Sequence, residues 1–265
     1  MTIQQAITAA TTKLEVTSTS PRLDALVLLA HQLDLDTSEL LREVGQELSP
    51  ADSQAYEQLL KQRMNHVPVA YLRGFTEFYG HNFKVSPDVL IPRPETEQLV
   101  SYAIQLTPPQ AQLVDIGTGS GNLAISVKLA RPDLTVYASD TSTAALAITR
   151  QNADALGVEI ELGEGDLLEP WPEEFAVICA NLPYVPQKHP CSPATRYEPQ
   201  SALFAGTDGL DLYRRLLPQA TAKLDPAGLL ILEALPQQHK ALNRLATNYR
   251  LQLEASIDFC LVFKN

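Results

Sequence analysis

A glycine-rich segment between two acidic residues carries the strongest chemical signal in the sequence. Leu113–Gly121 reads Leu-Val-Asp-Ile-Gly-Thr-Gly-Ser-Gly and begins inside a run typical of a strand. Gly117, Gly119 and Gly121 allow the chain to turn sharply and a ligand to approach backbone N–H groups. In the dinucleotide-binding fingerprint the third glycine comes one residue later, where this chain has Asn122, so the spacing indicates a different ligand.

Two acidic residues frame the ligand that this segment would bind. Asp115 would repel a diphosphate and would suit a ligand that carries an ammonium group. Asp140 ends the next predicted strand, where a carboxylate typically accepts hydrogen bonds from ribose hydroxyls. The order acid, GxGxG, acid resembles the S-adenosylmethionine-binding site of class I methyltransferases. The alternative interpretation is a tight structural turn, which would require neither acid.

A second motif, Asn181-Leu-Pro-Tyr184, follows the predicted strand at 175–180. Ligands of open parallel sheets bind beyond the carboxyl ends of the strands, so we expect Asn181 at the same crevice. Asn-x-Pro-Tyr alone is common turn chemistry. At this place in a methyltransferase-like sheet, it resembles the motif of enzymes that methylate planar NH2 groups of adenine, cytosine or glutamine amides.

The residues of this motif match a specific chemical need. An amide nitrogen is a poor nucleophile because its lone pair is delocalised. The side-chain oxygen of Asn181 and the backbone carbonyl of Leu182 can accept both N–H bonds, so that the lone pair turns toward the methyl group. Tyr184 offers a flat face to the amide and a π-surface to a sulfonium.

The elements that must position these residues alternate between strand and helix from about residue 97 onward. Such alternation predicts an α/β fold with a mostly parallel, seven-stranded sheet and helices on both faces. Two final strands with no helix between them predict one antiparallel pair at the sheet edge. The expected strands are 112–116, 135–139, 159–162, 175–180, 229–232, 252–257 and 260–263, and the intervening helices end at Pro132, Gly157 and Pro226.

The first part of the chain reads instead as a small helical bundle. Apolar residues recur at helical spacing over 3–14 and 20–33, a short helix is expected over 37–45, and a Ser-Pro pair begins another over 50–64. We predict a helical domain over 1–74, for which the pattern alone leaves a structural cap and a binding role equally open.

A β-hairpin linker is expected over 75–92. Two short strand-like runs flank Gly80, and the following Ile-Pro-Arg-Pro segment is held extended by its two prolines. The predicted catalytic domain then covers 93–265.

Charge and composition exclude several classes of protein. Hydrophobic residues make up 45% of the 265 residues, which is too many for a disordered chain. The net charge is −11, with 6 basic and 9 acidic residues in 1–75 and 14 and 22 in the remainder. A chain so acidic is a poor general nucleic-acid binder, because phosphate affinity is built from Lys and Arg.

Cysteine and histidine usage indicates a reducing compartment and no metal site. The cysteines Cys179, Cys191 and Cys260 are odd in number and lack CxxC spacing, and the five histidines show no ligand spacing. The start of the sequence is not a signal peptide, and no apolar run is long enough to span a bilayer. We therefore expect a cytoplasmic protein.

Further motifs extend the resemblance to one family, the release factor glutamine N5-methyltransferases of the HemK type. The resemblance covers nearly the whole chain, and its most specific part is Pro-Arg-Pro-Glu-Thr-Glu. The motifs, in family order, are Ser20–Asp24, Pro68–Gly74, Glu77–Gly80, Leu90–Glu97, Asp115–Gly121, Asn181–Tyr184 and Tyr197-Glu-Pro with Asp208–Leu210. The resemblance implies a helical N-terminal domain that contacts the release factor, and a seven-stranded, Rossmann-like catalytic domain. It also implies methylation of the glutamine in the Gly-Gly-Gln loop of peptide chain release factors.

Residue roles follow from the same resemblance. Arg93, Glu95 and Thr96 would close one wall of the site. The substrate amide would meet Asn181, Leu182, Pro183 and Tyr184. S-adenosylmethionine, which leaves as S-adenosylhomocysteine, would contact Gly117, Thr118, Gly119, Ser120, Gly121, Asp140, Asp166, Leu167 and Asn181.

The chain departs from the family pattern at several positions. Leu182 replaces the first of two prolines, and Leu167 stands where an aromatic residue is common. The segment after Glu233 lacks a glycine, and the tail after Asp258 lacks the usual Gly and Arg, which bears on the last strand pair.

Three rival functions are open on the sequence alone. Adenine N6-methylation of RNA or DNA is disfavoured by the acidic catalytic half. Glutamine methylation of a ribosomal protein is a sibling activity. A binding module on a decayed methyltransferase fold is disfavoured because Asp115, Asp140 and Asn181 are all present.

Overall fold

The computed structural model describes residues 1–265 and divides into two compact units. The helical unit comprises Met1–Phe75 together with Ser192–Tyr197. The sheet unit comprises Thr76–Cys191 together with Glu198–Asn265. The chain thus passes from one unit to the other three times, whereas the sequence anticipates only the first passage.

Five helices build the helical unit around one apolar core that draws on residues 3–72. Capping fixes where helices begin, because Thr2 and Asp36 form capping boxes and the Ser49 hydroxyl accepts the N–H of Asp52. The third helix ends at Arg42, three residues before the predicted end, and the fifth was not predicted. The helices are α1 (Ile3–Leu14), α2 (Pro21–Gln32), α3 (Thr37–Arg42), α4 (Pro50–Met64) and α5 (Val69–Arg73).

A segment from the second half of the chain completes the helical unit. It forms the 3-10 turn η2 (Pro193–Tyr197). Arg196 Nη2 and the Tyr197 hydroxyl both donate to the backbone carbonyl of Asn65, at 2.7 and 2.8 Å. Asn65 is the C-cap of α4, and the last carbonyls of a helix have no partner within it. The segment therefore satisfies an acceptor that the helix itself leaves open.

The sheet unit contains the predicted seven-stranded sheet, in the order β5-β4-β3-β6-β7-β9-β8. The first five strands in that order pair in parallel, and β9 is antiparallel to both β7 and β8. The predicted antiparallel pair at the edge is confirmed despite the atypical tail. The strands are β3 (Gln112–Ile116), β4 (Thr135–Asp140), β5 (Glu161–Glu164), β6 (Phe175–Ala180), β7 (Leu224–Glu233), β8 (Gln252–Ile257) and β9 (Cys260–Lys264).

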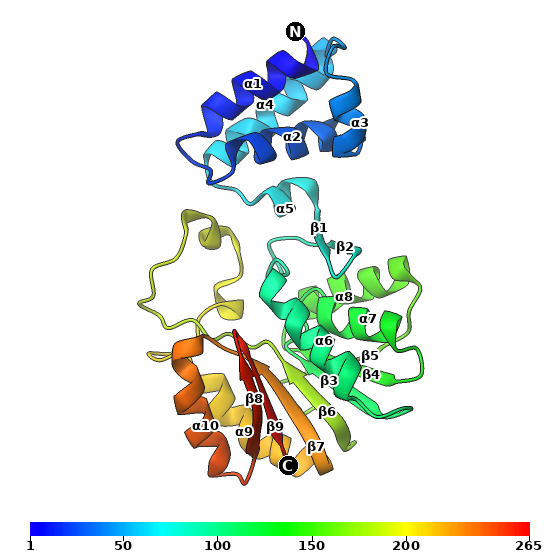
Figure 1. Ribbon diagram of the computed structural model, residues 1–265, viewed down its shortest axis with the longest axis vertical. Coiled ribbons are helices and arrows are strands. Elements are labelled where there is room, and N and C mark those ends of the chain that lie inside the picture. The colour runs from blue at the N-terminus through cyan, green and yellow to red at the C-terminus, as the bar shows by residue number, and fades with distance from the viewer. The chain divides into compact units, whose positions relative to one another are not determined.

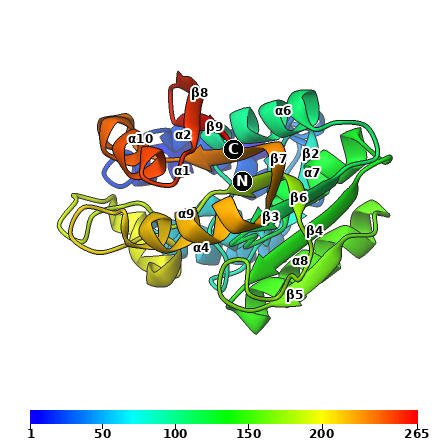
Figure 2. The ribbon, with the colours of Figure 1, turned by 90° about the horizontal axis from the view of Figure 1, so that it is seen from below.

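Helices cover both faces of this sheet, as Figures 1 and 2 show. Two groups of helices lie on opposite faces of the sheet. One apolar cluster packs the first group against its face, and a second cluster packs the second group against the other face. The central strand β6 is buried along its whole length, which matches its unbroken apolar run. The first group is α6 (Glu97–Leu106), α7 (Asn122–Ala130) and α8 (Thr143–Leu156), and the second is α9 (Asp211–Lys223) and α10 (His239–Thr247).

Short elements connect these layers. The predicted hairpin consists of β1 (Phe75–Phe78) and β2 (His81–Lys84), joined through Tyr79 and Gly80, both with positive φ as a two-residue hairpin turn requires. The remaining 3-10 turns are η1 (Pro94–Thr96), η3 (Gln200–Ala202) and η4 (Pro236–Gln238).

The largest differences from the predicted strand bounds are in β5 and β7. Strand β5 begins at Glu161, two residues later than predicted, because its pairing with β4 begins at Glu161. Pro226 was expected to end a helix, but α9 ends at Lys223 and Pro226 lies within β7. The pairing of β6 with β7 shifts register between Phe175 and Val177, and such an irregularity accommodates a proline without losing a ladder hydrogen bond.

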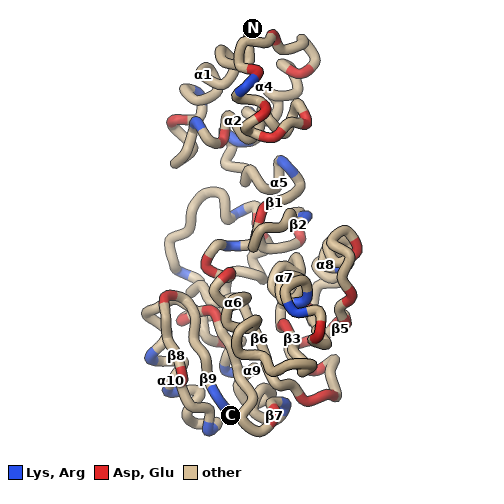
Figure 3. Tube along the Cα trace, turned by 45° about the vertical axis from the view of Figure 1, so that its right-hand side comes forward, with Lys and Arg blue, Asp and Glu red and all other residues tan.

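No helix is long and apolar enough to cross a membrane. Figure 3 shows the basic positions scattered along the trace of each unit.

Candidate active site

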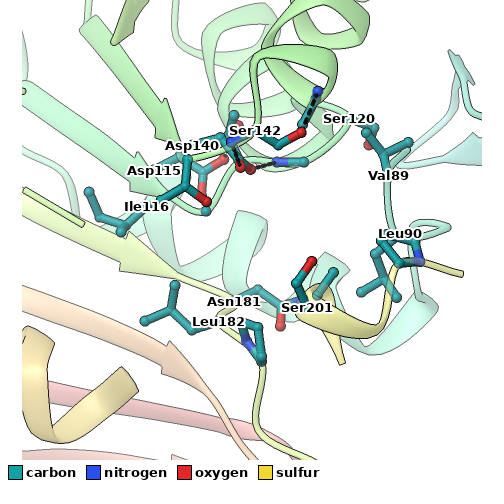
Figure 4. A pocket seen from close by; sticks show the side chains of 18 of the residues that line it. Val89, Leu90, Asp115, Ile116, Ser120, Asp140, Ser142, Asn181, Leu182 and Ser201 are labelled. Carbon is teal, nitrogen blue, oxygen red and sulfur yellow. Dashed lines mark hydrogen bonds between the residues drawn. The ribbon is translucent and has the colours of Figure 1, made fainter. Parts of the chain in front are cut away.

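The motifs converge on one cavity at the carboxyl ends of β3, β4 and β6. The cavity has a volume of about 490 Å³, and every residue that lines it belongs to the sheet unit. In Figure 4, Asp140 and Ser142 lie on one side of the cavity, and Asn181 and Leu182 lie across from them. The predicted site residues that line it are Gly117, Thr118, Gly119, Ser120, Asp140, Asp166, Leu167, Asn181, Leu182 and Pro183. Gly121 and Tyr184 do not line it.

Close packing explains two of the glycines. Gly117 has φ +71°, and a Cβ there would come within 3.0 Å of Leu182 Cδ2. Gly121 has φ +78° and begins α7, and a Cβ there would lie 2.6 Å from Thr149 Cγ2. The Thr149 hydroxyl also donates to the carbonyl of Gly119 at 2.9 Å. The loop is thus held tightly between β3 and two helices, with its backbone facing the cavity.

Asp140 connects the glycine loop to the start of α8. One oxygen, Oδ2, accepts the N–H of Gly119 at 3.0 Å, and the other, Oδ1, accepts the N–H of Ser142 at 2.9 Å. A carboxylate offers about four acceptor positions, so about two remain at the cavity. This arrangement fits a ligand with two adjacent hydroxyls, such as a ribose.

Asp115 lies beneath the loop and is almost fully buried. Burial raises the pKa of this carboxyl to about 7, against the opposing hydrogen bonds from the Thr118 hydroxyl and the Ala124 N–H, and the charge of Asp140 raises it further. Thr118 Oγ1 donates to Asp115 Oδ2 at 2.7 Å. A cationic group in the cavity would favour the ionised form of Asp115.

The Asp166–Leu167 pair forms the far end of the cavity. Asp166 accepts a charged hydrogen bond from Arg215, which also lines the cavity. Leu167 has φ +54°, an uncommon conformation for a non-glycine residue, and Ser139 Oγ donates to its carbonyl at 2.8 Å. The strained backbone turns the Leu167 side chain inward, where it is buried against the core.

Asn181 follows β6 directly, and its side chain is oriented by a neighbour from another element. Asn181 Nδ2 donates to the Thr96 hydroxyl at 2.9 Å, which leaves Oδ1 as the atom that can accept a hydrogen bond in the cavity. The next backbone carbonyl, that of Leu182, is 3.5 Å from the Tyr213 hydroxyl, whose shorter hydrogen bond goes to the carbonyl of Glu233. Two acceptors of the kind that an NH2 group requires therefore lie on consecutive residues.

Tyr184 does not line the cavity, and a hydrogen bond to a neighbouring strand holds its side chain. Its hydroxyl donates to Glu233 Oε1 at 2.9 Å. Burial, followed by the nearby Glu233 charge, raises the pKa of Tyr184 well above its usual range, so the phenol stays protonated. The hydroxyl therefore anchors Tyr184 to Glu233, and contact between its flat face and the amide stays a prediction.

Gln238 fixes the backbone that follows the motif. Its Nε2 donates to the carbonyls of Tyr184 and Asp208, both at 2.8 Å. Gly209 lies between them with φ +77°, and a Cβ there would fall 2.0 Å from the Tyr184 carbonyl oxygen. The Asp208–Leu210 motif thus has a steric basis, because only glycine permits this clamp.

The Pro-Arg-Pro-Glu-Thr segment is divided between two cavities. Arg93 and Thr96 line the active-site cavity, whereas Glu95 lines a second, open cavity of the sheet unit. Arg93 Nη2 donates to both oxygens of the buried Glu198, at 2.6 and 2.8 Å, and Glu198 also accepts the N–H of Ile91. The ion pair joins two family motifs that are far apart in the sequence.

The sequence analysis did not place Glu233 at the site. This residue ends β7, the strand next to β6, and it is completely buried beside Asn181, Thr96 and Tyr184. Its position one strand over from the Asn181 motif was the available signal, since acids at neighbouring strand ends meet at one crevice.

The strand order and the antiparallel β9 distinguish this sheet from fully parallel dinucleotide-binding sheets. With an acid in place of a diphosphate site at the glycine loop, they define a S-adenosylmethionine-dependent methyltransferase. A solved methyltransferase from Pyrococcus furiosus has the same fold, with a TM-score of 0.55 and 18% identity over 71% of this chain and 90% of its own.

Sequence comparisons identify the family. The PrmC N-terminal domain profile matches residues 5–74, and the methyltransferase small domain profile matches residues 96–196. A release factor glutamine methyltransferase of Moorella thermoacetica is 40% identical over 93% of this chain and 90% of its own length. One from Neisseria gonorrhoeae is 40% identical over 80% of each chain. The chain belongs to the release factor glutamine methyltransferase family.

Proposed function

We propose that this chain transfers a methyl group from S-adenosylmethionine to the side-chain amide nitrogen of the glutamine in the Gly-Gly-Gln loop of peptide chain release factors. The observation that carries the proposal is the likeness to relatives named for that activity, at 40% identity over 93% of the chain. The two consecutive acceptors at Asn181 and Leu182 support it independently.

The cofactor, once bound, supplies a methyl group on a positively charged sulfur. Asp140 would accept hydrogen bonds from its ribose hydroxyls. Its adenine would lie against Leu167 and Asp166, and its ammonium group would face the side of the cavity near Asp115. The residues of the glycine loop would surround the remainder. The cavity volume of about 490 Å³ lies within the range of small-molecule sites.

The substrate amide would be held by its two N–H groups. Asn181 Oδ1 and the Leu182 carbonyl accept these hydrogens, so the nitrogen lone pair is directed out of the amide plane. Transfer would form the nitrogen–carbon bond as the bond between the methyl group and sulfur breaks, and the nitrogen would then lose one of its two protons to water. Leu182 contributes only its carbonyl, so a leucine in place of the more common proline is compatible with this role.

Recognition must extend beyond the amide, because glutamine is a common residue. Two adjacent glycines would let a backbone loop enter a narrow cavity, and the small contact area requires a second contact. We propose that the helical unit provides it. The net charge of −11 favours a basic protein partner and disfavours direct nucleic-acid binding, and the cysteine usage supports a cytoplasmic location.

The test is methyl transfer from labelled S-adenosylmethionine to an intact purified release factor, with mass mapping of the modified residue. Parallel reactions with ribosomal proteins and with adenine-containing RNA and DNA separate the alternatives. Label on the Gly-Gly-Gln glutamine supports the proposal. Label only on a ribosomal protein or on nucleic acid overturns it.

The role of Asn181 has its own prediction. Asn181→Ala should still bind S-adenosylmethionine, yet lose far more turnover than cofactor affinity, because positioning contributes on the order of 7–11 kcal/mol to transfer reactions. Calorimetry and steady-state methylation measure the two effects. Near-normal turnover in this variant would refute the assigned role.

A further inference from the structure

Two buried polar side chains, those of Thr96 and Glu233, lie behind the half-buried Asn181. Asn181 Nδ2 donates to Thr96 Oγ1 at 2.9 Å. Thr96 is 2% exposed and Glu233 is 0% exposed, so water does not reach either side chain. The three side chains come from three separate elements, because Asn181 follows β6, Thr96 ends η1 and Glu233 ends β7.

Counting donors and acceptors leaves one of each unmatched. The Thr96 hydroxyl oxygen accepts a hydrogen bond from Asn181 Nδ2. No hydrogen bond of the structure uses the hydrogen of the Thr96 hydroxyl. Glu233 Oε1 accepts from the Tyr184 hydroxyl, while the buried Oε2 has no partner. Buried polar groups are almost always satisfied, so the free hydrogen and the free oxygen are natural partners.

The electrostatics of Glu233 agree with this pairing. Burial raises the pKa of the Glu233 carboxyl, and the neighbouring polar groups of Thr96, Tyr184 and Asn181 act against that rise. Thr96 is the first of these opposing influences. Its hydroxyl therefore lies where it stabilises the carboxylate.

The direction of the Thr96 hydrogen decides which atom Asn181 presents to the substrate. An asparagine amide can present either its oxygen or its NH2 group by turning over. If the Thr96 hydrogen pointed at Asn181, the asparagine oxygen would turn to Thr96 and its NH2 would face the cavity. Two NH2 groups cannot hydrogen-bond to each other, so a substrate amide would be rejected.

We propose that Glu233, acting through Thr96, is the positioning residue that keeps Asn181 Oδ1 turned toward the substrate. As a carboxylate, Glu233 takes the Thr96 hydrogen, and Thr96 can then only accept from Asn181 Nδ2. The inference rests on the proposed function and deepens it. The relay makes the site selective for a group with two N–H donors and selects against a carboxylate such as glutamate.

The test replaces Glu233 with an apolar side chain of similar length. Glu233→Met should lower kcat by about tenfold to a hundredfold, the loss expected for one hydrogen bond to a charged group, while cofactor affinity stays within about twofold. Its melting temperature should change by only a few degrees, because the removal of a buried charge offsets the cost of the hydroxyls left without an acceptor. A loss of turnover that follows from unfolding would instead lower the melting temperature.

Variants of Thr96 and Tyr184 separate the relay from other roles of Glu233. Thr96→Val should lose turnover as Glu233→Met does, Thr96→Ser should restore most of it, and the double variant should be no slower than either single one. Tyr184→Phe is the matched control, because it removes the other hydrogen bond to Glu233 and leaves the relay intact. It should lose less turnover than Glu233→Met.

Clear outcomes would overturn the relay. One is an unchanged kcat in a stable Glu233→Met protein. Another is additive losses of turnover when Glu233→Met and Thr96→Val are combined. The third is a loss of turnover in Tyr184→Phe as large as that in Glu233→Met. These outcomes are distinct from failure of the proposed function, in which the wild-type protein itself would not methylate the release-factor glutamine.

Discussion

Asp115 shows how one buried carboxyl can link cofactor, pH and stability. Its pKa of about 7 means that the folded protein without ligand holds a proton that the unfolded chain, with an ordinary carboxyl pKa near 4, has already released. Between these two pKa values the folded state binds more protons, so stability falls as pH rises through the window. Above pH 7 the full cost of a buried charge is present.

We therefore expect Asp115→Asn to be more stable than the wild type at pH 8 without cofactor. The difference should be near zero at pH 4 and should grow to at most about 4 kcal/mol, at 1.36 kcal/mol per pKa unit. Urea unfolding of both proteins across this range measures it. The same variant should bind S-adenosylmethionine more weakly at pH 8. A difference that does not vary with pH would contradict the assigned titration.

Asp140 combines a structural and a ligand role. Asp140→Ala should weaken S-adenosylmethionine binding by about tenfold to a hundredfold, because a hydrogen bond to a charged group contributes about 1.5–3 kcal/mol. Calorimetry provides the measurement, and Asp154→Ala, at an exposed position of α8, is the control. Equal affinities in the two variants would remove Asp140 from the cofactor site.

At the scale of single residues, the sequence predicts acids and amides at strand ends well and predicts side-chain direction poorly. Asp140 and Asn181 each end or directly follow a strand, so the parallel sheet brings them together. Tyr184 could not be placed in this way. Its direction is set by Glu233, 49 positions later, which no local pattern reveals.

At the scale of elements, Gly209 offers a sharp test of the clamp that holds the Asn181 motif. Gly209→Ala should lower stability by more than about 3 kcal/mol, because the added Cβ meets the Tyr184 carbonyl as well as a left-handed backbone conformation. Gly157 is the matched control, since it has φ +69° but open space around its position.

Gly157→Ala should therefore cost only the conformational strain, about 1–2 kcal/mol. Chemical unfolding of both variants separates the two contributions. Equal losses of unfolding free energy in the two variants would mean that the backbone at Tyr184 moves aside for the added Cβ at no energetic cost.

The elements themselves were largely predictable, because their signals are local. Strands β3, β6 and β8 match their predicted bounds, and α4 ends at Met64 as expected. The start of β7 was missed because a register shift admits Pro226 into the strand. The pairing of Arg93 with Glu198 was also missed, although both belong to recognised motifs, because 105 residues separate them.

At the scale of the whole molecule, the acidic character of the helical unit is a testable recognition feature. The Glu15 and Glu47 side chains are exposed and lie outside the apolar core of the unit. Changing both to lysine would shift the charge of residues 1–75 from −3 to about +1 by simple count. We expect KM for an intact release factor to rise at low salt, with kcat and cofactor affinity unchanged.

The salt dependence of KM should decrease in the same variant, because steering by opposite charges is screened by salt. A short Gly-Gly-Gln peptide should be a poor substrate for both proteins and should not distinguish them. An unchanged KM for the intact factor would reduce the helical unit to a structural cap. Deleting residues 1–74 is a less direct test, because the deletion would also remove the partner of Arg196 and Tyr197.

The passage of Ser192–Tyr197 into the helical unit has a consequence for synthesis on the ribosome. The apolar core of that unit needs only residues 3–72, so it can form while most of the sheet has yet to be translated. The carbonyl of Asn65, however, has only water as a donor until Arg196 and Tyr197 have emerged from the ribosome. By then β3 to β6 have also emerged and β7 has not. The nascent chain thus returns to its oldest folded part midway through building its sheet.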